Sequence, residues 1–208
     1  MIQKGNTMHD NQEPKRHDVR IKILDVDPKD IDERLSKSGA RKIFNRLMTR
    51  TLMFDHQTLR LRNTGRVLRL RQVGKKVFLS IKSGGDGAPE SRFQKVYESE
   101  LELNDFNQAF SLFESLGFTA FRYQEKLRTG YTTSRGVHIE LDEFPKIPSY
   151  IEIEGPTEDV VNDCVLQIGY SPNDIVRMSA TEVLRHYGVK DVDIVRFPDS
   201  EISEGIIE

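Results

Sequence analysis

The chain has 208 residues, 37% of them hydrophobic, which is enough to bury the core of one large domain or of two small ones. Its 31 basic and 33 acidic residues leave a formal net charge of −2, which excludes the global excess typical of proteins that bind nucleic acid or anionic membranes. A single cysteine, Cys164, excludes a disulfide framework and a cysteine zinc site. No stretch resembles a signal peptide or reaches membrane-spanning length, so we expect a cytoplasmic protein.

The first half of the chain alternates between strands and turns. Residues 1–16 are polar and predict a disordered leader, followed by one folded domain over 17–190. Asp18 to Ile23 alternates charged and apolar residues, which predicts a strand with two unlike faces. A helix is predicted at 28–42. Further alternating segments predict strands at 46–55, 66–73, 76–82 and 92–103.

The second half repeats this organisation. Asn104 is expected to cap a helix that ends at Leu116 and buries a stripe of phenylalanines. Three strands follow, and then two helices and an acidic tail at 191–208 that we expect to be loosely held. The strands are predicted at 120–132, 136–143 and 149–155, and the helices at 157–168 and 179–187.

Charged residues recur two apart on the polar faces of these strands, so each pair leaves the same face. The pairs are segregated by sign, one sign to a strand. A solvated sheet face explains any single pair, but it would mix in Ser, Thr, Asn and Gln. The basic pairs are Arg69 with Arg71 and Lys126 with Arg128; the acidic pairs are Glu98 with Glu100, Glu140 with Asp142 and Glu152 with Glu154; Lys22 and Lys82 are single cations.

If about eight antiparallel strands close into a barrel with helices outside, this charged face becomes a lumen. Arg and Lys match the oxygens of linked phosphates, and clustered carboxylates can hold a hard metal ion that bridges to the same phosphates. The pattern therefore predicts an α+β fold, built on a closed eight-stranded antiparallel barrel whose lumen binds a polyphosphate with metal.

Six segments in this order resemble the CYTH superfamily, the triphosphate tunnel metalloenzymes, over about 17–188. The segments are Val67–Arg71, Leu79–Lys82, Tyr97–Glu100, Glu125–Arg128, Ile139–Asp142 and Tyr150–Glu154. Class IV adenylate cyclases, thiamine triphosphatases and inorganic triphosphatases are members. The resemblance implies an enzyme that binds a triphosphate or nucleotide with Mg²⁺ or Mn²⁺, without a nucleic-acid or membrane partner. A homodimer remains open.

The resemblance also implies roles for individual residues. Catalytic roles fall to Lys22, Glu98, Glu100 and Lys126. Substrate binding falls to Arg20, Lys22, Arg69, Arg71, Lys82, Lys126 and Arg128. Metal binding falls to Asp18, Glu98, Glu100, Asp142, Glu152 and Glu154.

The first strand departs from the family. The family opens with Glu-x-Glu-x-Lys, whereas this chain has Asp18-Val19-Arg20-Ile21-Lys22, so only Lys22 matches outright. Arg20 reverses the charge where a metal ligand is expected. We predict that Arg20 points into the lumen, pairs with Glu152 or Glu154 or reaches a phosphate oxygen, and leaves room for at most one metal ion.

Three functions fit the sequence. The first is metal-dependent hydrolysis of a triphosphate-containing substrate by a water that a carboxylate orients. The second is conversion of ATP to cyclic AMP and pyrophosphate, and the third is non-catalytic binding of polyphosphate or nucleotide. The sequence does not separate hydrolysis from cyclisation, because both use nearly the same lumen, nor does it identify the organic group on the triphosphate.

Overall fold

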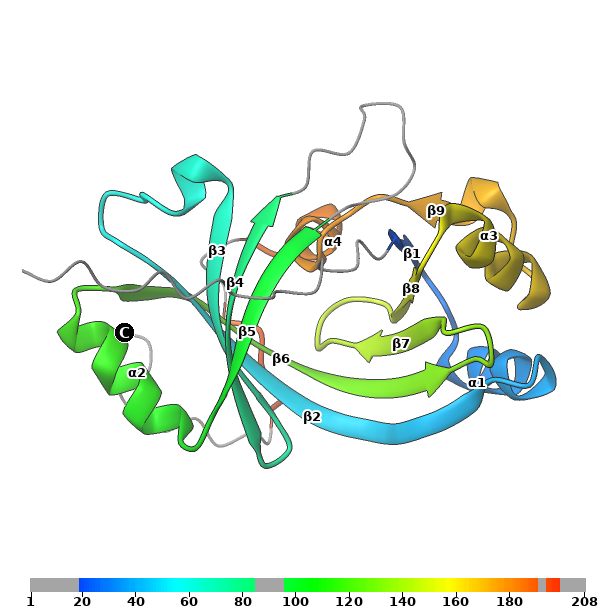
Figure 1. Ribbon diagram of the computed structural model, residues 1–208, viewed down its shortest axis with the longest axis horizontal. Helices are drawn as coiled ribbons and strands as arrows, with labels where there is room; N and C mark the ends of the chain where they lie inside the picture. Colours follow the sequence, from blue (N-terminus) through cyan, green and yellow to red (C-terminus); the bar gives the residue numbers. More distant parts are fainter. Residues whose placement is uncertain (1–18, 85–95, 191–193, 199–208) are drawn as a thin grey trace, which may run out of the picture.

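A curled antiparallel sheet organises the molecule (Figure 1). The computed structural model describes residues 19–84, 96–190 and 194–198. Nine strands pair in the order β5-β4-β3-β2-β6-β7-β8-β1-β9. Their bounds are β1 Val19–Ile23, β2 Arg41–Asp55, β3 Arg66–Val73, β4 Lys76–Gly84, β5 Val96–Leu103, β6 Thr119–Thr132, β7 His138–Glu143, β8 Tyr150–Gly155 and β9 Ile175–Val176.

The α+β class and the antiparallel sheet confirm the prediction, whereas the sheet is curled and is not closed into the predicted eight-stranded barrel among the residues that the structure describes. Among these residues the ladder ends at β5 on one side and at β9 on the other. β9 pairs with β1 through Lys22–Val176 and Ile23–Ile175, so it occupies the edge of β1 that closure would require. A two-residue strand is too short to be recognised from alternation, which is why the alternating pattern predicts eight strands and not nine.

Four α-helices and two short 3₁₀ helices complete the described part of the chain. Their bounds are α1 Pro28–Lys37, α2 Phe106–Ser115, α3 Glu158–Gln167, α4 Ala180–His186, η1 Arg62–Thr64 and η2 Pro172–Asp174. None of the helices in the described ranges is long and apolar enough to cross a membrane.

The first helix is shorter than predicted. Asp27 caps it by accepting hydrogen bonds from the backbone N–H groups of Lys29 and Asp30 at 2.9 Å. Gly39, at φ +82°, ends it, and β2 already begins at Arg41. The predicted helix at 28–42 is therefore wrong beyond Lys37, because the left-handed glycine outweighs the helical spacing before it.

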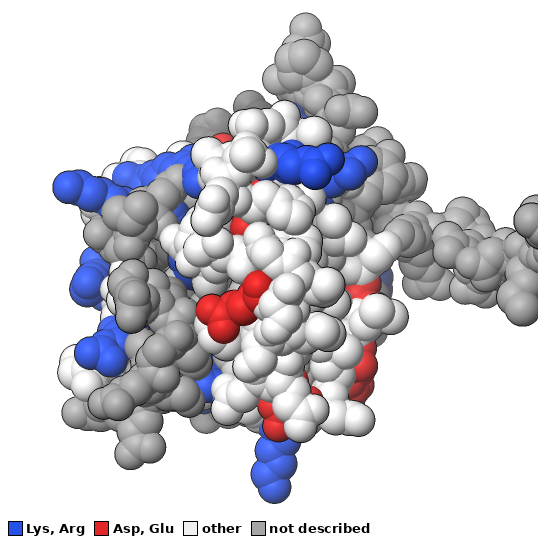
Figure 2. Space-filling view, turned by 90° about the vertical axis from the view of Figure 1, so that its left-hand side faces the viewer, with Lys and Arg blue, Asp and Glu red and all other residues white. Residues whose placement is uncertain are grey.

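One apolar cluster lies between α2 and the convex face of the sheet. Phe54 of β2 packs against Phe113 with ring centroids 5.2 Å apart, and Phe106 and Phe110 extend the same stripe. The predicted phenylalanine core is thus confirmed. On the side of the molecule where α2 lies, the described surface is mostly uncharged, with a group of Asp and Glu side chains near its centre and Lys and Arg toward its edges (Figure 2).

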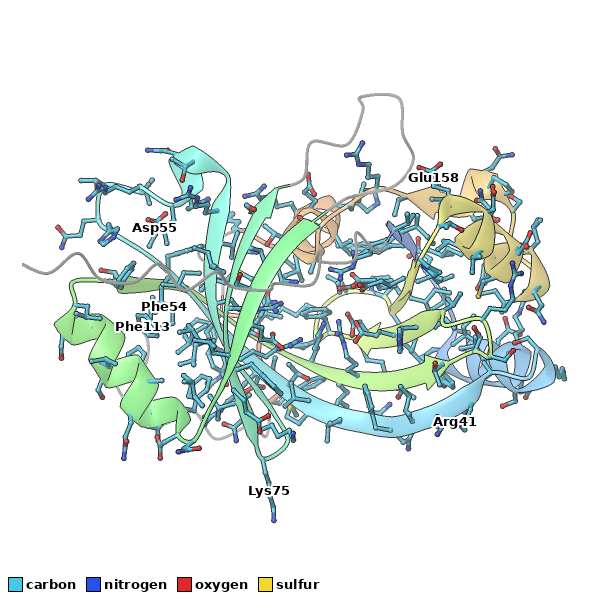
Figure 3. The ribbon with its side chains drawn as sticks, in the orientation of Figure 1. Arg41, Phe54, Asp55, Lys75, Phe113 and Glu158 are labelled. Carbon is cyan, nitrogen blue, oxygen red and sulfur yellow. The ribbon has the colours of Figure 1, made fainter. Side chains whose placement is uncertain are left out.

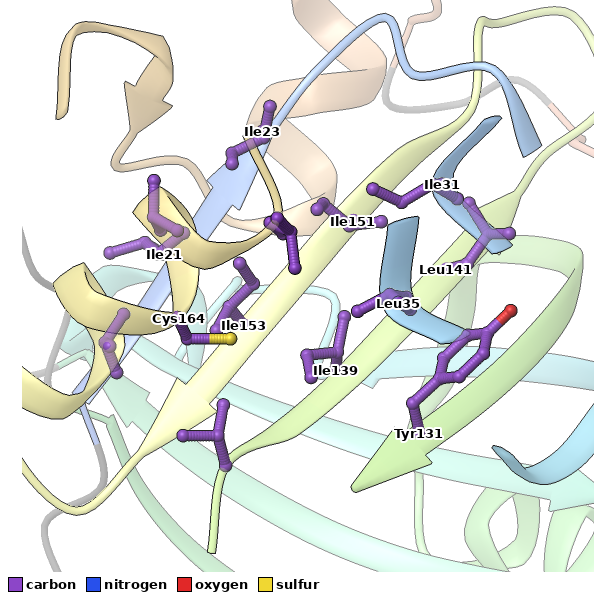
Figure 4. Close-up of a cluster of buried hydrophobic side chains, with 14 of the residues drawn as sticks. Ile21, Ile23, Ile31, Leu35, Tyr131, Ile139, Leu141, Ile151, Ile153 and Cys164 are labelled. Atoms are coloured by element: carbon purple, nitrogen blue, oxygen red, sulfur yellow. The ribbon is translucent and has the colours of Figure 1, made fainter. Parts of the chain in front are cut away.

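A second cluster lies under α1 and α3 (Figure 4). Ile31 and Leu35 of α1 are fully buried against isoleucines of β1, β7 and β8. Cys164 of α3 belongs to this cluster as a buried packing residue. Both clusters occupy the convex face, so the charged residues of the same strands are directed to the concave face.

The C-terminal segment is held more firmly than predicted. Val195 is 1% exposed and packs with α4, and its N–H donates to the carbonyl of Tyr123 at 3.1 Å. Its own carbonyl accepts the N–H of Glu125 at 2.7 Å. The segment fills the edge of β6 beyond the reach of β7, whose ladder begins at Leu127. The expectation of a loosely held tail is therefore wrong for 194–198; the leader at 1–16 and positions 191–193 and 199–208 lie outside the described residues.

A buried carboxylate anchors the loop between β2 and β3. Asp55, at the end of β2 (Figure 3), accepts hydrogen bonds from the N–H groups of His56, Leu61 and Arg62 at 2.7–3.0 Å. Burial alone would raise the pKa of Asp55, but these three N–H groups outweigh it and lower the pKa. The ionised carboxylate therefore fixes the path of the chain into η1.

Replacing Asp55 by Asn keeps the shape but sets an amide N–H₂ against a backbone N–H. We expect urea denaturation at pH 7 to show a loss of about 1–3 kcal/mol in the free energy of unfolding. Because the folded-state pKa is depressed, the advantage of the wild type is complete above about pH 4 and disappears as the pH falls further. An equal loss at pH 3 and pH 7 would show that the carboxylate charge is not what holds this loop.

Candidate functional site

The concave face of the sheet and α4 enclose a cavity of about 700 Å³. Eleven of the described residues that line it are Lys or Arg, and five are Glu. The cations are Arg20, Lys22, Arg62, Arg66, Arg69, Arg71, Lys82, Arg122, Lys126, Arg128 and Arg185, and the acids are Glu100, Glu140, Glu152, Glu154 and Glu182.

β3, β4 and β5 supply the first bank of charges. Arg71 Nη2 lies 2.9 Å from Glu100 Oε2, and Arg69 Nη2 lies 3.7 Å from the same oxygen. Arg69 also donates from Nε to Ser80 Oγ at 3.1 Å. One carboxylate thus holds two arginines of one strand side by side, with their side chains directed into the cavity.

β6 and β7 supply the second bank. Arg128 donates from Nε and Nη2 to the two oxygens of Asp142 at 2.7 and 2.8 Å, and Lys126 Nζ donates to Asp142 Oδ2 at 2.7 Å. Arg128 also pairs with Glu140. Because Asp142 is fully buried, this network is largely shielded from solvent and holds both cations in place.

Burial opposes the charges of Lys126 and Asp142 in this network. Burial and the neighbouring Arg128 together lower the pKa of Lys126 to about 8, even though Asp142 opposes the shift. Burial also works against the charge of Asp142, but Arg128 and Lys126 outweigh it and lower its pKa. Lys126 therefore stays mostly protonated at pH 7 but is a readier proton donor than an exposed lysine.

β1 and β8 supply the third bank, which contains Arg20. Arg20 donates to Glu154 Oε2 from Nε at 2.9 Å and from Nη2 at 2.5 Å, and its Nε lies 3.3 Å from Glu152 Oε1. Lys22 Nζ lies 2.5 Å from Glu152 Oε2. The prediction that Arg20 points to the charged face and pairs with Glu152 or Glu154 is confirmed, with both carboxylates as partners.

The pKa shifts in this bank follow from burial and pairing. Burial disfavours the charge of Glu152, yet Lys22 and Arg20 lower its pKa well below the usual range. Burial raises the pKa of Glu154, and Arg20 offsets this only in part. Glu154 is accordingly a better proton acceptor than Glu152.

The predicted metal ligands do not assemble into a metal site in the described part of the chain. No group of three or more His, Cys, Asp or Glu side chains there could hold a metal ion. Glu100, Asp142, Glu152 and Glu154 each face at least one Arg or Lys instead. The donor set is thus a set of ion pairs, and it does not fit a preformed Mg²⁺ or Mn²⁺ cage. Asp18 and the side chain of Glu98 lie outside the described residues.

Eleven of the thirteen predicted site residues are therefore placed, and ten of them line the cavity; Asp142 lies beneath its surface. The sequence missed four cations of the lining, and their positions are Arg62, Arg66, Arg122 and Arg185. Arg122 lies an even number of residues before Lys126 and Arg128 on β6, so strand alternation alone places it on the same face. Arg185 comes from α4, whose place beside the sheet no local pattern shows.

Comparisons with known proteins agree with this geometry. The family model for the CYTH domain matches residues 19–177. A candidate adenylate cyclase from Vibrio parahaemolyticus superposes with a TM-score of 0.69 at 16% identity, covering 82% of this chain and 98% of the other. The PH1012 protein of Pyrococcus horikoshii gives 0.67 at 22% identity over 80% and 98% of the two chains.

A third neighbour is a candidate adenylyl cyclase from Hippeastrum with a dominant triphosphatase activity. Its TM-score is 0.59 at 20% identity, and the match covers 81% of this chain and 95% of that one. At such identities these structures show a shared fold. No curated protein matches the sequence.

A substitution at Arg20 tests whether its guanidinium neutralises Glu152 and Glu154 in place of a metal ion. Replacing Arg20 by Glu removes the guanidinium from between Glu152 and Glu154 and adds a third carboxylate to the same bank. Calorimetric titration with Mn²⁺ should then show tighter metal binding than in the wild type, together with at least about tenfold weaker metal-free binding of tripolyphosphate, on the scale of one charge-assisted contact.

Arg20→Gln is the matched control, because it removes the cation without adding a carboxylate. It should weaken tripolyphosphate binding to a similar degree while gaining less affinity for Mn²⁺. Two Mn²⁺ ions bound by the wild-type protein would contradict the view that Arg20 already neutralises these carboxylates.

Proposed function

Because this chain belongs to the CYTH domain family, we propose that it hydrolyses a triphosphate-containing substrate bound in the concave cavity. One observation carries the proposal, namely the excess of cations over carboxylates in the lining of a cavity in a protein whose formal net charge is −2. A triphosphate supplies the negative charge that this lining lacks, at a size that the cavity accommodates.

Carboxylates hold the cations of the cavity in position before a ligand binds. Buried cations without partners are costly, and in this cavity Glu100, Asp142 and Glu152 offset that cost. Arg71 of β3 and Arg128 of β6 come from the two strands that flank β2, and their planar guanidinium groups suit phosphate oxygens. Phosphoryl transfer depends mainly on such positioning and charge neutralisation, so the protein does not need to form a covalent intermediate.

Two groups fit the proton transfers of hydrolysis. Water attacks the terminal phosphorus and the bond to the bridging oxygen breaks, so that orthophosphate leaves the remaining diphosphate. Glu154, whose pKa is raised by burial, is suited to accept a proton from the attacking water. Lys126, with its pKa near 8, is suited to stabilise or protonate the leaving oxygen.

Mg²⁺ or Mn²⁺ remains part of the proposal, but no step above depends on it. When bound, such an ion would neutralise phosphate charge. The described carboxylates are already paired, so the metal titration of Arg20→Glu is the direct test of where it binds.

The neighbours support two related reactions. The Hippeastrum protein has a dominant triphosphatase activity, and it shares the fold of this chain, which favours hydrolysis. The Vibrio neighbour bears the name of an adenylate cyclase, which keeps cyclisation of ATP as the second candidate. The ion pairs of Arg20 favour the third candidate, binding without turnover, because they occupy two carboxylates that catalysis would use.

A release assay distinguishes these functions. The wild-type protein should release phosphate from tripolyphosphate, thiamine triphosphate or ATP in the presence of Mg²⁺ or Mn²⁺, with little cyclic AMP formed from ATP. Replacing Arg71 or Lys82 by Ala should weaken triphosphate binding by about 1.5–3 kcal/mol, because each removes a charge-assisted contact.

Arg135→Ala is the matched control. Arg135 pairs with Asp163 on the surface at 2.8 Å and does not line the cavity, so its removal should leave both binding and turnover unchanged. Cyclic AMP as the main product would favour the cyclase, tight binding without release would favour the sensor, and unchanged affinity in both Arg71→Ala and Lys82→Ala would exclude this cavity.

A further inference from the structure

Part of the cavity lining is apolar, and a triphosphate does not need these side chains. Most of its lining is charged or polar, but Met53 of β2, Val67 of β3 and Phe121 of β6 also line it. They sit near one another, because β2 lies between β3 and β6 and Met53 pairs with both Arg69 and Arg122. A phosphate chain gains nothing from these side chains, whereas an organic group attached to it would.

A β-bulge brings Phe121 into this part of the lining. On β2, Met53 pairs with Arg122 and the next residue, Phe54, pairs with Ala120, so that Phe121 is an extra residue without a partner on β2. As a result Phe121 and Arg122, which are consecutive, both line the cavity. In a regular strand they would point to opposite faces.

Phe121 is not explained as a core residue. It is partly exposed and does not belong to the described cluster of buried side chains under α2, which contains its neighbour Tyr123. Its ring instead lies under the guanidinium of Arg62, with Cζ 4.9 Å from the ring centroid. Arg62 is placed there by η1, whose entry is fixed by the bond from the Arg62 N–H to Asp55.

We propose that Phe121 and Arg62 bind a planar heteroaromatic group at the end of the triphosphate. The proposal rests on the function proposed above and names the substrate class: a triphosphate ester with an aromatic head, as opposed to inorganic tripolyphosphate. Aromatic rings and guanidinium planes both stack on heteroaromatic bases. Arg66 and Arg122 line the cavity beside this pair and fit the phosphate nearest the head.

Calorimetry in chelating buffer measures this site without turnover. The probes are the β,γ-methylene analogue of ATP, thiamine triphosphate and tripolyphosphate, and the test variant is Phe121→Leu, which keeps an apolar side chain but removes the ring. The variant should lose at least about fivefold in affinity for one or both aromatic esters, and less than about twofold for tripolyphosphate. Which ester loses affinity identifies the head as a purine nucleoside or a thiamine.

Tyr170→Leu is the matched control, because it also removes a ring that lies under an arginine. Arg34 Cζ lies 5.2 Å from the Tyr170 ring centroid, and neither residue lines the cavity. All three affinities should be unchanged. Equal losses of the esters and tripolyphosphate in Phe121→Leu, or no loss at all, would overturn the proposal.

The calorimetry and the phosphate-release assay together distinguish this proposal from the proposed function. If binding of an ester depends on the ring of Phe121 but no phosphate is released, the aromatic site is supported and hydrolysis is rejected. Phosphate release from tripolyphosphate and from the esters at equal efficiency, with no effect of Phe121→Leu on either, would retain hydrolysis and reject the aromatic site.

Discussion

The buried contact of Arg128 and Lys126 with Asp142 is the interaction on which the concave face depends. Two cations on neighbouring positions of one strand face would repel each other in a region shielded from water. A single carboxylate from β7, fully buried and bonded to both, makes that arrangement tolerable. Glu100 does the same for Arg69 and Arg71, and Glu152 for Arg20 and Lys22.

This pairing also explains why the sheet can be charged on one face and apolar on the other. The convex face is stabilised by the clusters under α1, α2 and α3, which bury most of the aliphatic residues of the strands. The concave face contributes little apolar burial of its own. The free-energy cost of burying its charges is limited, because each described carboxylate of the three banks is bonded to a cation. When a polyanion binds, the cations exchange one anionic partner for another, and their long side chains do not have to be ordered anew.

Much of this was accessible from the sequence, because strand alternation is a local property. Arg69 with Arg71 and Glu152 with Glu154 leave the same face whenever their segments are extended, and the structure places each pair so. Closure of the sheet is not local. It depends on what occupies the edge of β1, and β9 offers two residues without an alternating pattern.

Two other features that the sequence did not predict also depend on contacts between distant segments. The bulge at Phe121 changes which face a residue meets, and only the pairing of β6 with β2 shows it. Arg185 and the segment around Val195 reach the sheet from helices and turns at the end of the chain. The predicted helix at 28–42 is too long for a different, local reason, because Gly39 adopts the left-handed conformation and ends the helix before Arg41.

The pairing of β1 with β8 has a consequence for the order in which the molecule forms. Arg20 and Glu154 are 134 residues apart in sequence, so the third bank closes one of the longest loops in the chain. Contacts of such high sequence separation are slow to form. During synthesis β1 is made before its partner β8, so it stays unpaired until most of the polypeptide has been made. We therefore expect incomplete chains to aggregate through the unpaired β1 more readily than through β3 and β4, which are neighbours in the chain and pair with each other.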